Sequence, residues 1–170
     1  MRVIGIDPGY AIVGCGILEY NGSVFRTLEY GAITTPAGME FTARLQIIYD
    51  QTTELLTTFH PEAMAVEKLY FNTNTTTTID VAQARGVILL AAKQQGIPVY
   101  EYTPSQVKQA VVGYGKAEKR QVIEMTQKIL SLKTTPKPDD VADALAIAVC
   151  HAHTGPSPLE RLLLHGRPRG

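Results

Sequence analysis

Two acidic residues stand directly after short apolar runs, where a carboxylate is costly to bury unless a partner compensates its charge. Asp7 follows Val3–Ile6 and precedes Pro8-Gly9, and Glu67 follows residues 63–66. Such runs are typical of buried strands, so both acids are expected at the carboxyl ends of strands, where open α/β sheets bind ligands. Asp7 alone would also suit a turn that begins before Pro-Gly. Further carboxylates in matching places favour the ligand-binding interpretation.

Two more acids lie three residues apart at the start of a helical pattern. Asp140 and Asp143 therefore project from one face of the predicted helix. Alanines at every second position from 142 to 148 would let this helix approach the sheet closely. Asp143 lies one turn into an apolar helix, which is an awkward place for a surface acid. Asp139 is better explained as an N-cap or a first-turn acid that the helix dipole favours.

The helix and the two strands would bring four carboxylates together if they packed against one another. These are Asp7, Glu67, Asp140 and Asp143. Such carboxylates repel one another unless cations lie between them, and oxygen ligands in this number suit Mg²⁺ or, as a substitute, Mn²⁺, but not zinc. Two such ions about 4 Å apart can hold the attacking water and the leaving oxygen of a phosphodiester. We therefore expect two-metal-ion phosphodiester hydrolysis that leaves 5′-phosphate and 3′-hydroxyl ends.

Basic residues are concentrated in the segment 105–137, although the formal net charge of the chain is zero. They are Lys108, Lys116, Lys119, Arg120, Lys128, Lys133 and Lys137. Only Glu118 and Glu124 oppose them there. A local basic surface is what binding to a phosphate backbone requires. A solvated helical face explains the same pattern equally well, so charge alone leaves both interpretations open.

The elements that must position these residues are predicted from periodicity and turn signals. We expect strands at 3–6, 11–20, 23–34, 63–67 and 97–102, and helices at 40–60, 79–95, 103–112, 117–132 and 139–153. Asn21-Gly22 is a strong hairpin signal. The order β-β-β-α-β-α-β-α-α-α predicts an α/β fold with a mixed five-stranded sheet, its first three strands antiparallel, and helices on both faces. The ribonuclease H-like arrangement has this shape, and one family of nucleotide-binding ATPases begins similarly.

Length and composition indicate one globular domain, because 170 residues with 45% hydrophobic and 19% charged side chains can form a sizeable core. We expect a single nuclease domain at 1–153 and a loosely ordered tail at 154–170, where Pro and Gly are frequent. The apolar runs are too short to span a bilayer, and no signal peptide is expected. Cys15 and Cys150 are expected as small core residues, which fits a reducing cytoplasm.

Several short motifs together resemble the bacterial RuvC family of Holliday junction resolvases. They are Gly5-Ile6-Asp7-Pro8-Gly9, Val66-Glu67-Lys68, Gln83-Ala84-Arg85-Gly86, Val107-Lys108-Gln109, Gly113-Tyr114-Gly115, Ala117-Glu118-Lys119 and Asp140-Val141-Ala142-Asp143-Ala144-Leu145-Ala146. They occur in order over residues 1–153. The resemblance implies an endonuclease that resolves four-way DNA junctions by paired symmetric nicks, in homologous recombination and DNA repair.

The resemblance also implies roles for single residues. The four acids match the metal-binding catalytic acids of the family. Lys108 and Lys119 match basic residues that serve the DNA and the scissile phosphate, and Lys116 and Arg120 belong to the same expected DNA-binding surface. The family usually has a phenylalanine, inserted at the junction centre, where this chain has Tyr70. Either Tyr70 or its neighbour Phe71 is expected to take that place.

Partners follow from the symmetry of the substrate. A four-way junction is two-fold symmetric and one chain offers one site, so a homodimer is expected. The apolar helix at 79–95 is the candidate interface. The resemblance further implies a branch-migration complex of the RuvA and RuvB type as a partner.

Other functions compete with this interpretation. An ATP-dependent phosphotransferase of the actin and sugar-kinase type shares the Gly-x-Asp-x-Gly pattern, but its loop usually continues with Thr or Ser where this chain has Tyr10, and its fold is duplicated. Another ribonuclease H-like nuclease, acting on RNA:DNA hybrids or RNA ends, is the closest competitor in chemistry. A catalytically silent junction-binding module is disfavoured because all four acids are present.

Overall fold

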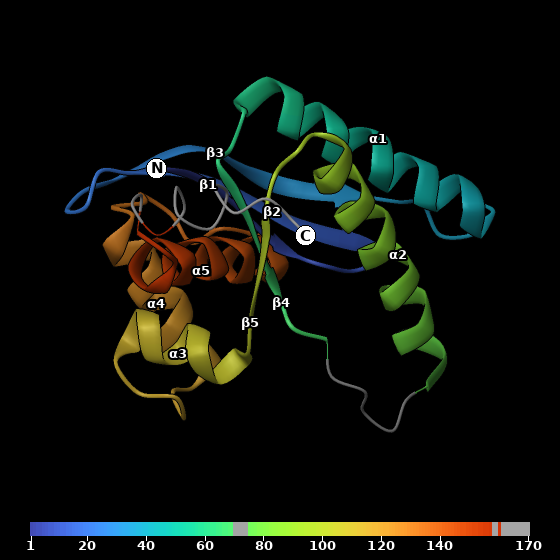
Figure 1. The fold of residues 1–170 in the computed structure, drawn as a ribbon. Helices are drawn as coiled ribbons and strands as arrows, with labels where there is room; N and C mark the ends of the chain where they lie inside the picture. The colour runs from blue at the N-terminus through green and yellow to red at the C-terminus, as the bar shows by residue number, and fades with distance from the viewer. Residues whose placement is uncertain (70–74, 158–159, 161–170) are drawn as a thin grey trace.

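The computed structural model describes residues 1–69, 75–157 and 160. Its elements are β1 (Arg2–Asp7), β2 (Ile12–Tyr20), β3 (Phe25–Thr34), α1 (Phe41–Phe59), β4 (Ala63–Glu67), α2 (Thr75–Gln94), β5 (Val99–Tyr102), α3 (Pro104–Val112), α4 (Lys119–Ile129) and α5 (Asp139–Thr154). The strands form one mixed sheet in the order β3-β2-β1-β4-β5 (Figure 1). The first three strands are antiparallel, whereas β4 runs parallel to β1 and to β5. The predicted element order and mixed sheet are confirmed.

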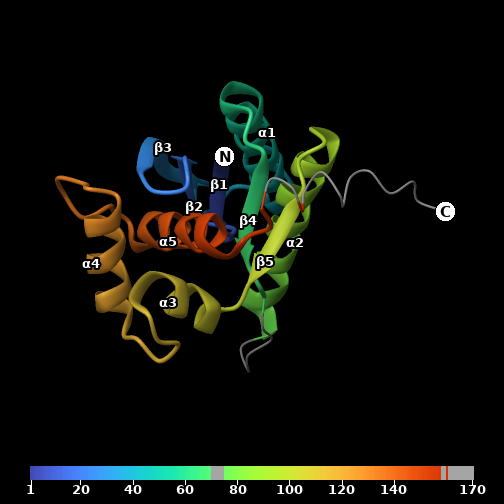
Figure 2. The same ribbon diagram turned by 60° about the vertical axis from the view of Figure 1, so that its left-hand side comes forward.

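Helices cover both faces of the sheet, as predicted. α1 and α2 lie on one face, and α5 lies on the other with α3 and α4 beside it (Figures 1 and 2). Side chains of β1 alternate between these layers: Ile4 and Ile6 pack in the same cluster as α1 and α2, and Val3 packs in the cluster of α5. Because both faces are buried, this strand is a continuous apolar run rather than an alternating pattern.

The turn between β2 and β3 follows its sequence signal. Gly22 adopts a positive φ of 100°, which glycine tolerates without a steric penalty. The side-chain oxygen of Asn21 accepts hydrogen bonds from the backbone N–H groups of Ser23 and Val24, at 3.1 and 2.9 Å. This side chain therefore fixes the turn and helps to set the register of the antiparallel pair.

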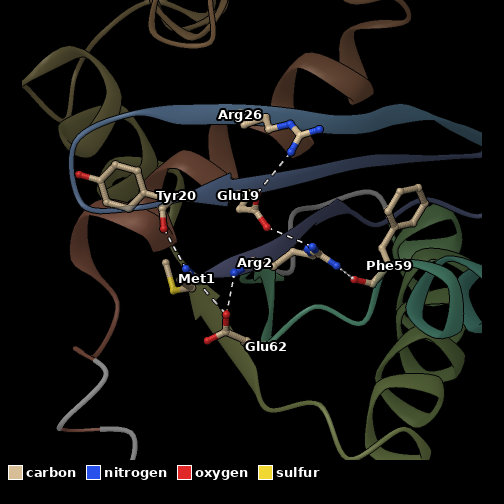
Figure 3. A network of polar contacts seen from close by, with 7 residues as sticks. All are labelled: Met1, Arg2, Glu19, Tyr20, Arg26, Phe59 and Glu62. Atoms are coloured by element: carbon tan, nitrogen blue, oxygen red, sulfur yellow. Dashed lines mark hydrogen bonds and ion pairs between the residues drawn. The ribbon is translucent and has the colours of Figure 1, made fainter.

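A polar network holds the amino-terminal end of β1 (Figure 3). The backbone N–H of Arg2 donates to Glu62 at 3.0 Å, and its guanidinium donates to Glu19 at 3.0 Å and to the carbonyl oxygen of Phe59. These contacts join β1 to β2, to the end of α1 and to the turn before β4. The charged groups are partly exposed, so each ion pair contributes little stability. The network mainly fixes where β1 begins.

α5 lies very close to the sheet because glycines in the strands face it. A Cβ atom on Gly5 would lie 2.0 Å from the carbonyl oxygen of Ala144, and one on Gly14 would lie 1.9 Å from that of Asp140. These are helix backbone atoms, so the helix would have to move away if either glycine gained a side chain. The alanines of the helix predict this close approach, and the glycines of the strands also permit it.

Several predicted boundaries were wrong by a few residues; β3, for example, begins at Phe25 rather than at residue 23. α2 begins at Thr75 rather than at residue 79. The run of threonines forms the first turn of the helix, where backbone N–H groups have no acceptor within the helix. α4 begins after Glu118, which forms a capping box with Gln121, and Ser131 follows its end with a φ of 51°. β5 begins after Pro98, which has no N–H to donate to the sheet.

Other expectations concern the cysteines and the ends of the chain. Cys15 and Cys150 are buried free thiols, as predicted. Within the described residues, no helix is long and apolar enough to cross a membrane. Most of the predicted tail at 154–170 lies outside the described residues.

Candidate active site

The first two acids meet because their strands are parallel neighbours. β1 and β4 pair in register, with Ile6 beside Val66, so Asp7 and Glu67 follow side by side at the carboxyl edge of the sheet. Both side chains are partly buried. The predicted placement of these two carboxylates at strand ends is confirmed.

The other two acids are brought to the same edge by α5. Asp7 pairs with Gly14 across the antiparallel β1–β2 ladder. Because Gly14 has no side chain, the backbone of Asp140 rests directly on it. The first turns of α5 therefore lie beside Asp7, and Asp143 follows one turn later. Sequence reasoning missed Gly14 as a determinant of the site, although glycines alternating with apolar residues in the run 13–17 were a signal for close packing.

Electrostatics show that the acids interact strongly. Burial, and then the charges of the other three acids, raise the pKa of Asp7 from 3.8 to about 7. Burial followed by the charge of Asp143 raises the pKa of Glu67, and burial also raises the pKa of Asp143. In all three cases the surroundings make ionisation of the acid less favourable than it is in water. This edge of the sheet is therefore short of positive charge.

One lysine partly compensates this negative charge. The ammonium of Lys119, the first residue of α4, lies 2.9 Å from Asp143 and 3.9 Å from Asp139. Its hydrogen bond to Asp143 raises the pKa of Lys119. Asp139 is a first-turn acid of α5, as one of the two predictions for it stated, and Pro138 takes the N-cap position. The hydrogen bond from Lys137 lowers the pKa of Asp139.

A second lysine faces the same acids from α3. Lys108 and Lys119 line a hollow of about 210 Å³, together with Glu67, Asp143 and Pro104. We call this the lysine hollow. α3 is held in place by a reciprocal capping box, in which Thr103 and Gln106 bond to each other's backbone N–H groups. Sequence reasoning predicted both lysines, and the structure brings both to the acids.

The remaining predicted DNA-binding residues lie elsewhere. Lys116 is exposed in the segment between α3 and α4. Arg120 is exposed on α4 and lies 3.8 Å from Glu124. Neither lines the lysine hollow. Tyr70 and Phe71 fall outside the described residues.

The donor set fits a hard divalent cation. Carboxylate oxygens are the ligands that Mg²⁺ and Mn²⁺ prefer, and burial together with the neighbouring acids raises the pKa of Asp7. Within residues 1–69, 75–157 and 160, no three His, Cys, Asp or Glu side chains already form a group arranged to hold a metal ion. Bare carboxylates repel one another, and Lys119 is paired with Asp143. A cation would both neutralise these charges and draw them together.

Comparisons with known proteins agree on one family. Residues 3–151 match the family model described as crossover junction endodeoxyribonuclease RuvC. The RuvC protein of Brevibacillus brevis is 59% identical over 152 residues, covering 89% of this chain and 92% of that protein. The RuvC protein of Clostridioides difficile is 55% identical and covers 91% of both chains.

A solved structure extends the likeness to three dimensions. The structure of Thermus thermophilus RuvC in complex with a Holliday junction substrate is 40% identical to this chain, with a TM-score of 0.86. The match covers 90% of this chain and 93% of that one. The predicted ribonuclease H-like fold class is confirmed by this likeness together with the observed strand order.

Proposed function

The chain belongs to the RuvC family of crossover junction endodeoxyribonucleases, and from this we propose that it resolves four-way DNA junctions by paired symmetric nicks. It is a DNA-binding hydrolase of phosphodiester bonds that serves recombination and repair. The observation that carries the proposal is the convergence of four acids on one sheet edge, where burial and the charges of the other three acids raise the pKa of Asp7 to about 7. We assign this activity to a single domain formed by residues 1–153.

Catalysis depends on a divalent metal ion, as the family implies. We infer two Mg²⁺ ions per site, replaceable by Mn²⁺, held by Asp7, Glu67, Asp140 and Asp143. Such ions, when bound, supply an activated water and stabilise the charge that develops on the phosphate oxygens. The supporting observation is chemical: these four side chains offer only hard oxygen donors, and burial raises the pKa of Asp7, Glu67 and Asp143.

The two lysines of the lysine hollow orient the scissile phosphate. Lys119 pairs with Asp143 in the protein alone. A cation held by the acids would compete for that carboxylate, and Lys119 would then be free to donate to a phosphate oxygen close to the same acids. Lys108 comes from another helix, and its charge opposes the rise in the pKa of Glu67 that burial and Asp143 cause, which supports its nearness to the same point. Hydrolysis leaves 5′-phosphate and 3′-hydroxyl ends, which a ligase can join.

Binding outside the scissile phosphate uses the wider basic surface. Lys116 and Arg120 are exposed and available to contact the DNA backbone. Tyr70 or Phe71 inserts at the junction centre, where stacking of one base on an aromatic ring contributes about 1–3 kcal/mol. Both residues are outside the described part of the chain, so this assignment rests on the family resemblance.

A homodimer is the assembly that matches a two-fold symmetric junction. Support comes from α2, which buries Ala84 and Ile88 within its own chain but leaves half of the surfaces of Ile79 and Leu90 exposed, at 54% and 50%. These side chains are available for a second copy. A branch-migration complex of the RuvA and RuvB type is a further partner implied by the family. We place the enzyme in the cytoplasm, where bacterial DNA and reduced thiols are found.

Removing one acid tests the assignment of the site. Asp7→Asn should abolish most turnover in Mg²⁺ on a labelled junction and leave junction binding intact, because it deletes a metal ligand and none of the basic surface. Equal loss of binding would indicate a structural role for Asp7. The cut ends supply a second test: ligase should seal them directly, whereas 3′-phosphate or cyclic ends would exclude the proposed hydrolysis.

A further inference from the structure

A second hollow adjoins the candidate active site. It measures about 290 Å³ and is lined by Asp7, Glu67 and Pro104, together with two cationic residues, Lys68 and Arg85. We call it the arginine hollow. It shares Glu67 and Pro104 with the lysine hollow. The acids are therefore bordered by two hollows, each of which carries a pair of cationic side chains.

Arg85 reaches this hollow from α2. Its side chain is only 14% exposed, and its guanidinium pairs with Glu101 of β5. Tyr100 and Tyr102, the neighbours of Glu101 on that strand, pack on the α5 side of the sheet. Because side chains alternate along a strand, Glu101 faces α2 and Arg85. A long cationic side chain is thus held next to the acids by a partner on a rigid element.

The ion pair with Glu101 does not satisfy the whole guanidinium. Arginine carries five N–H donors, and the buried Nε of Arg85 has no hydrogen-bond acceptor within the described residues. The pair with Glu101 therefore leaves donor capacity on the guanidinium of Arg85, which lines the hollow. Lys68 adds a second cation: it follows Glu67 directly, its side chain is exposed, and its backbone N–H bonds to Tyr102 at 2.8 Å.

A DNA strand that crosses the acids needs cations on both sides. The four carboxylates repel phosphates as they repel one another, and the lysine hollow compensates this on the α5 side only. We propose that the arginine hollow binds a neighbouring phosphodiester of the cleaved strand, with Arg85 and Lys68 as its contacts and Glu101 as the residue that positions Arg85. This subsite rests on the proposed junction-cutting function, because it orients the same strand.

The test separates a DNA contact from a purely structural ion pair. Glu101→Gln removes the partner and leaves the charge of Arg85, whereas Arg85→Gln/Glu101→Gln removes both charges without stranding either one. Junction binding is measured against salt concentration in a chelator, so that no strand is cut. The double variant should lose on the order of tenfold in affinity relative to Glu101→Gln. The slope of log affinity against log salt concentration is negative, and it should become shallower by about 0.9.

Three controls accompany this comparison. Lys93→Gln removes an exposed cation from the last turn of the same helix and should leave affinity unchanged. Arg85→Lys/Glu101→Gln keeps a cation and should keep the salt slope. Thermal unfolding of each variant identifies any that fails to fold; if Arg85→Gln/Glu101→Gln fails, Lys68→Gln takes its place in the comparison and should make the salt slope shallower by a similar amount.

Neutral phosphates locate the subsite on the DNA. Single methylphosphonates are placed at successive positions beside the cut. Each should lower the affinity of the wild-type protein for the junction only where a cationic side chain contacts the replaced phosphate. At one flanking position, the methylphosphonate should cause no loss of affinity in the double variant. If the double variant keeps the wild-type slope and the same methylphosphonate pattern, the arginine hollow is not a phosphate site. That result differs from failure of the proposed function, in which the wild-type protein itself would neither bind nor cut the junction.

Discussion

Replacing Asp7 by asparagine should stabilise the protein in the absence of metal while abolishing its activity. The rise of its pKa from 3.8 to about 7 corresponds to about 4 kcal/mol of free energy lost when Asp7 is ionised in the folded state. Asparagine has nearly the same shape and carries no charge, so it avoids this cost. The site would then be an example of stability given up for function.

The effect has a defined pH dependence. Because its pKa is raised on folding, Asp7 binds more protons in the folded than in the unfolded state between about pH 4 and pH 7. The contribution of Asp7 to stability therefore falls as the pH rises through that window. Relative to wild type, Asp7→Asn should gain about 1.5 kcal/mol at pH 5 and up to about 4 kcal/mol at pH 8.

Urea unfolding followed by circular dichroism, in a chelator at pH 5 and pH 8, measures this gain. Asp50→Asn, which removes an exposed acid from α1, is the matched control and should show little change at either pH. If Asp7→Asn is no more stable than wild type at pH 8, or if its gain shrinks between pH 5 and pH 8, the electrostatic description of the site is wrong.

Three further results are expected. Mg²⁺ should raise the melting temperature of the wild-type protein at pH 8 and raise that of Asp7→Asn much less, since a ligand that binds only the folded state stabilises it; equal shifts in a thermal melt would contradict the metal assignment. Gly14→Ala should cost about 1–3 kcal/mol in urea unfolding and reduce turnover, because its Cβ meets the backbone of α5, whereas Gly31→Ala, with open space around it, should be neutral. Lys119→Ala should lower turnover on the junction and reduce the salt slope of binding by about 0.9; unchanged values of both would refute its role.

The strand ends and the helix spacing could be predicted because they depend on local pattern. Asp7 and Glu67 follow apolar runs that read as buried strands, and Asp140 and Asp143 stand three apart on one helix. Local pattern also gave the element order, from which the mixed sheet follows.

Contacts between distant segments could not be predicted in the same way. Gly14 matters because it pairs with Asp7 and lies under Asp140, which is 126 positions away in the chain. The pairing of Arg85 with Glu101 depends on how α2 packs against β5. Periodicity gives the faces of elements, but the register between a helix and a sheet is set by packing of the whole core.

We expect this chain to cut each four-way junction by a pair of symmetric nicks. The purified protein is incubated with Mg²⁺ and two labelled substrates, a mobile four-way junction and a linear duplex of the same sequence. Paired, symmetric nicks in the junction and none in the duplex are the predicted result. Equal cutting of the duplex, or tight junction binding with no cleavage at all, would contradict the proposed function.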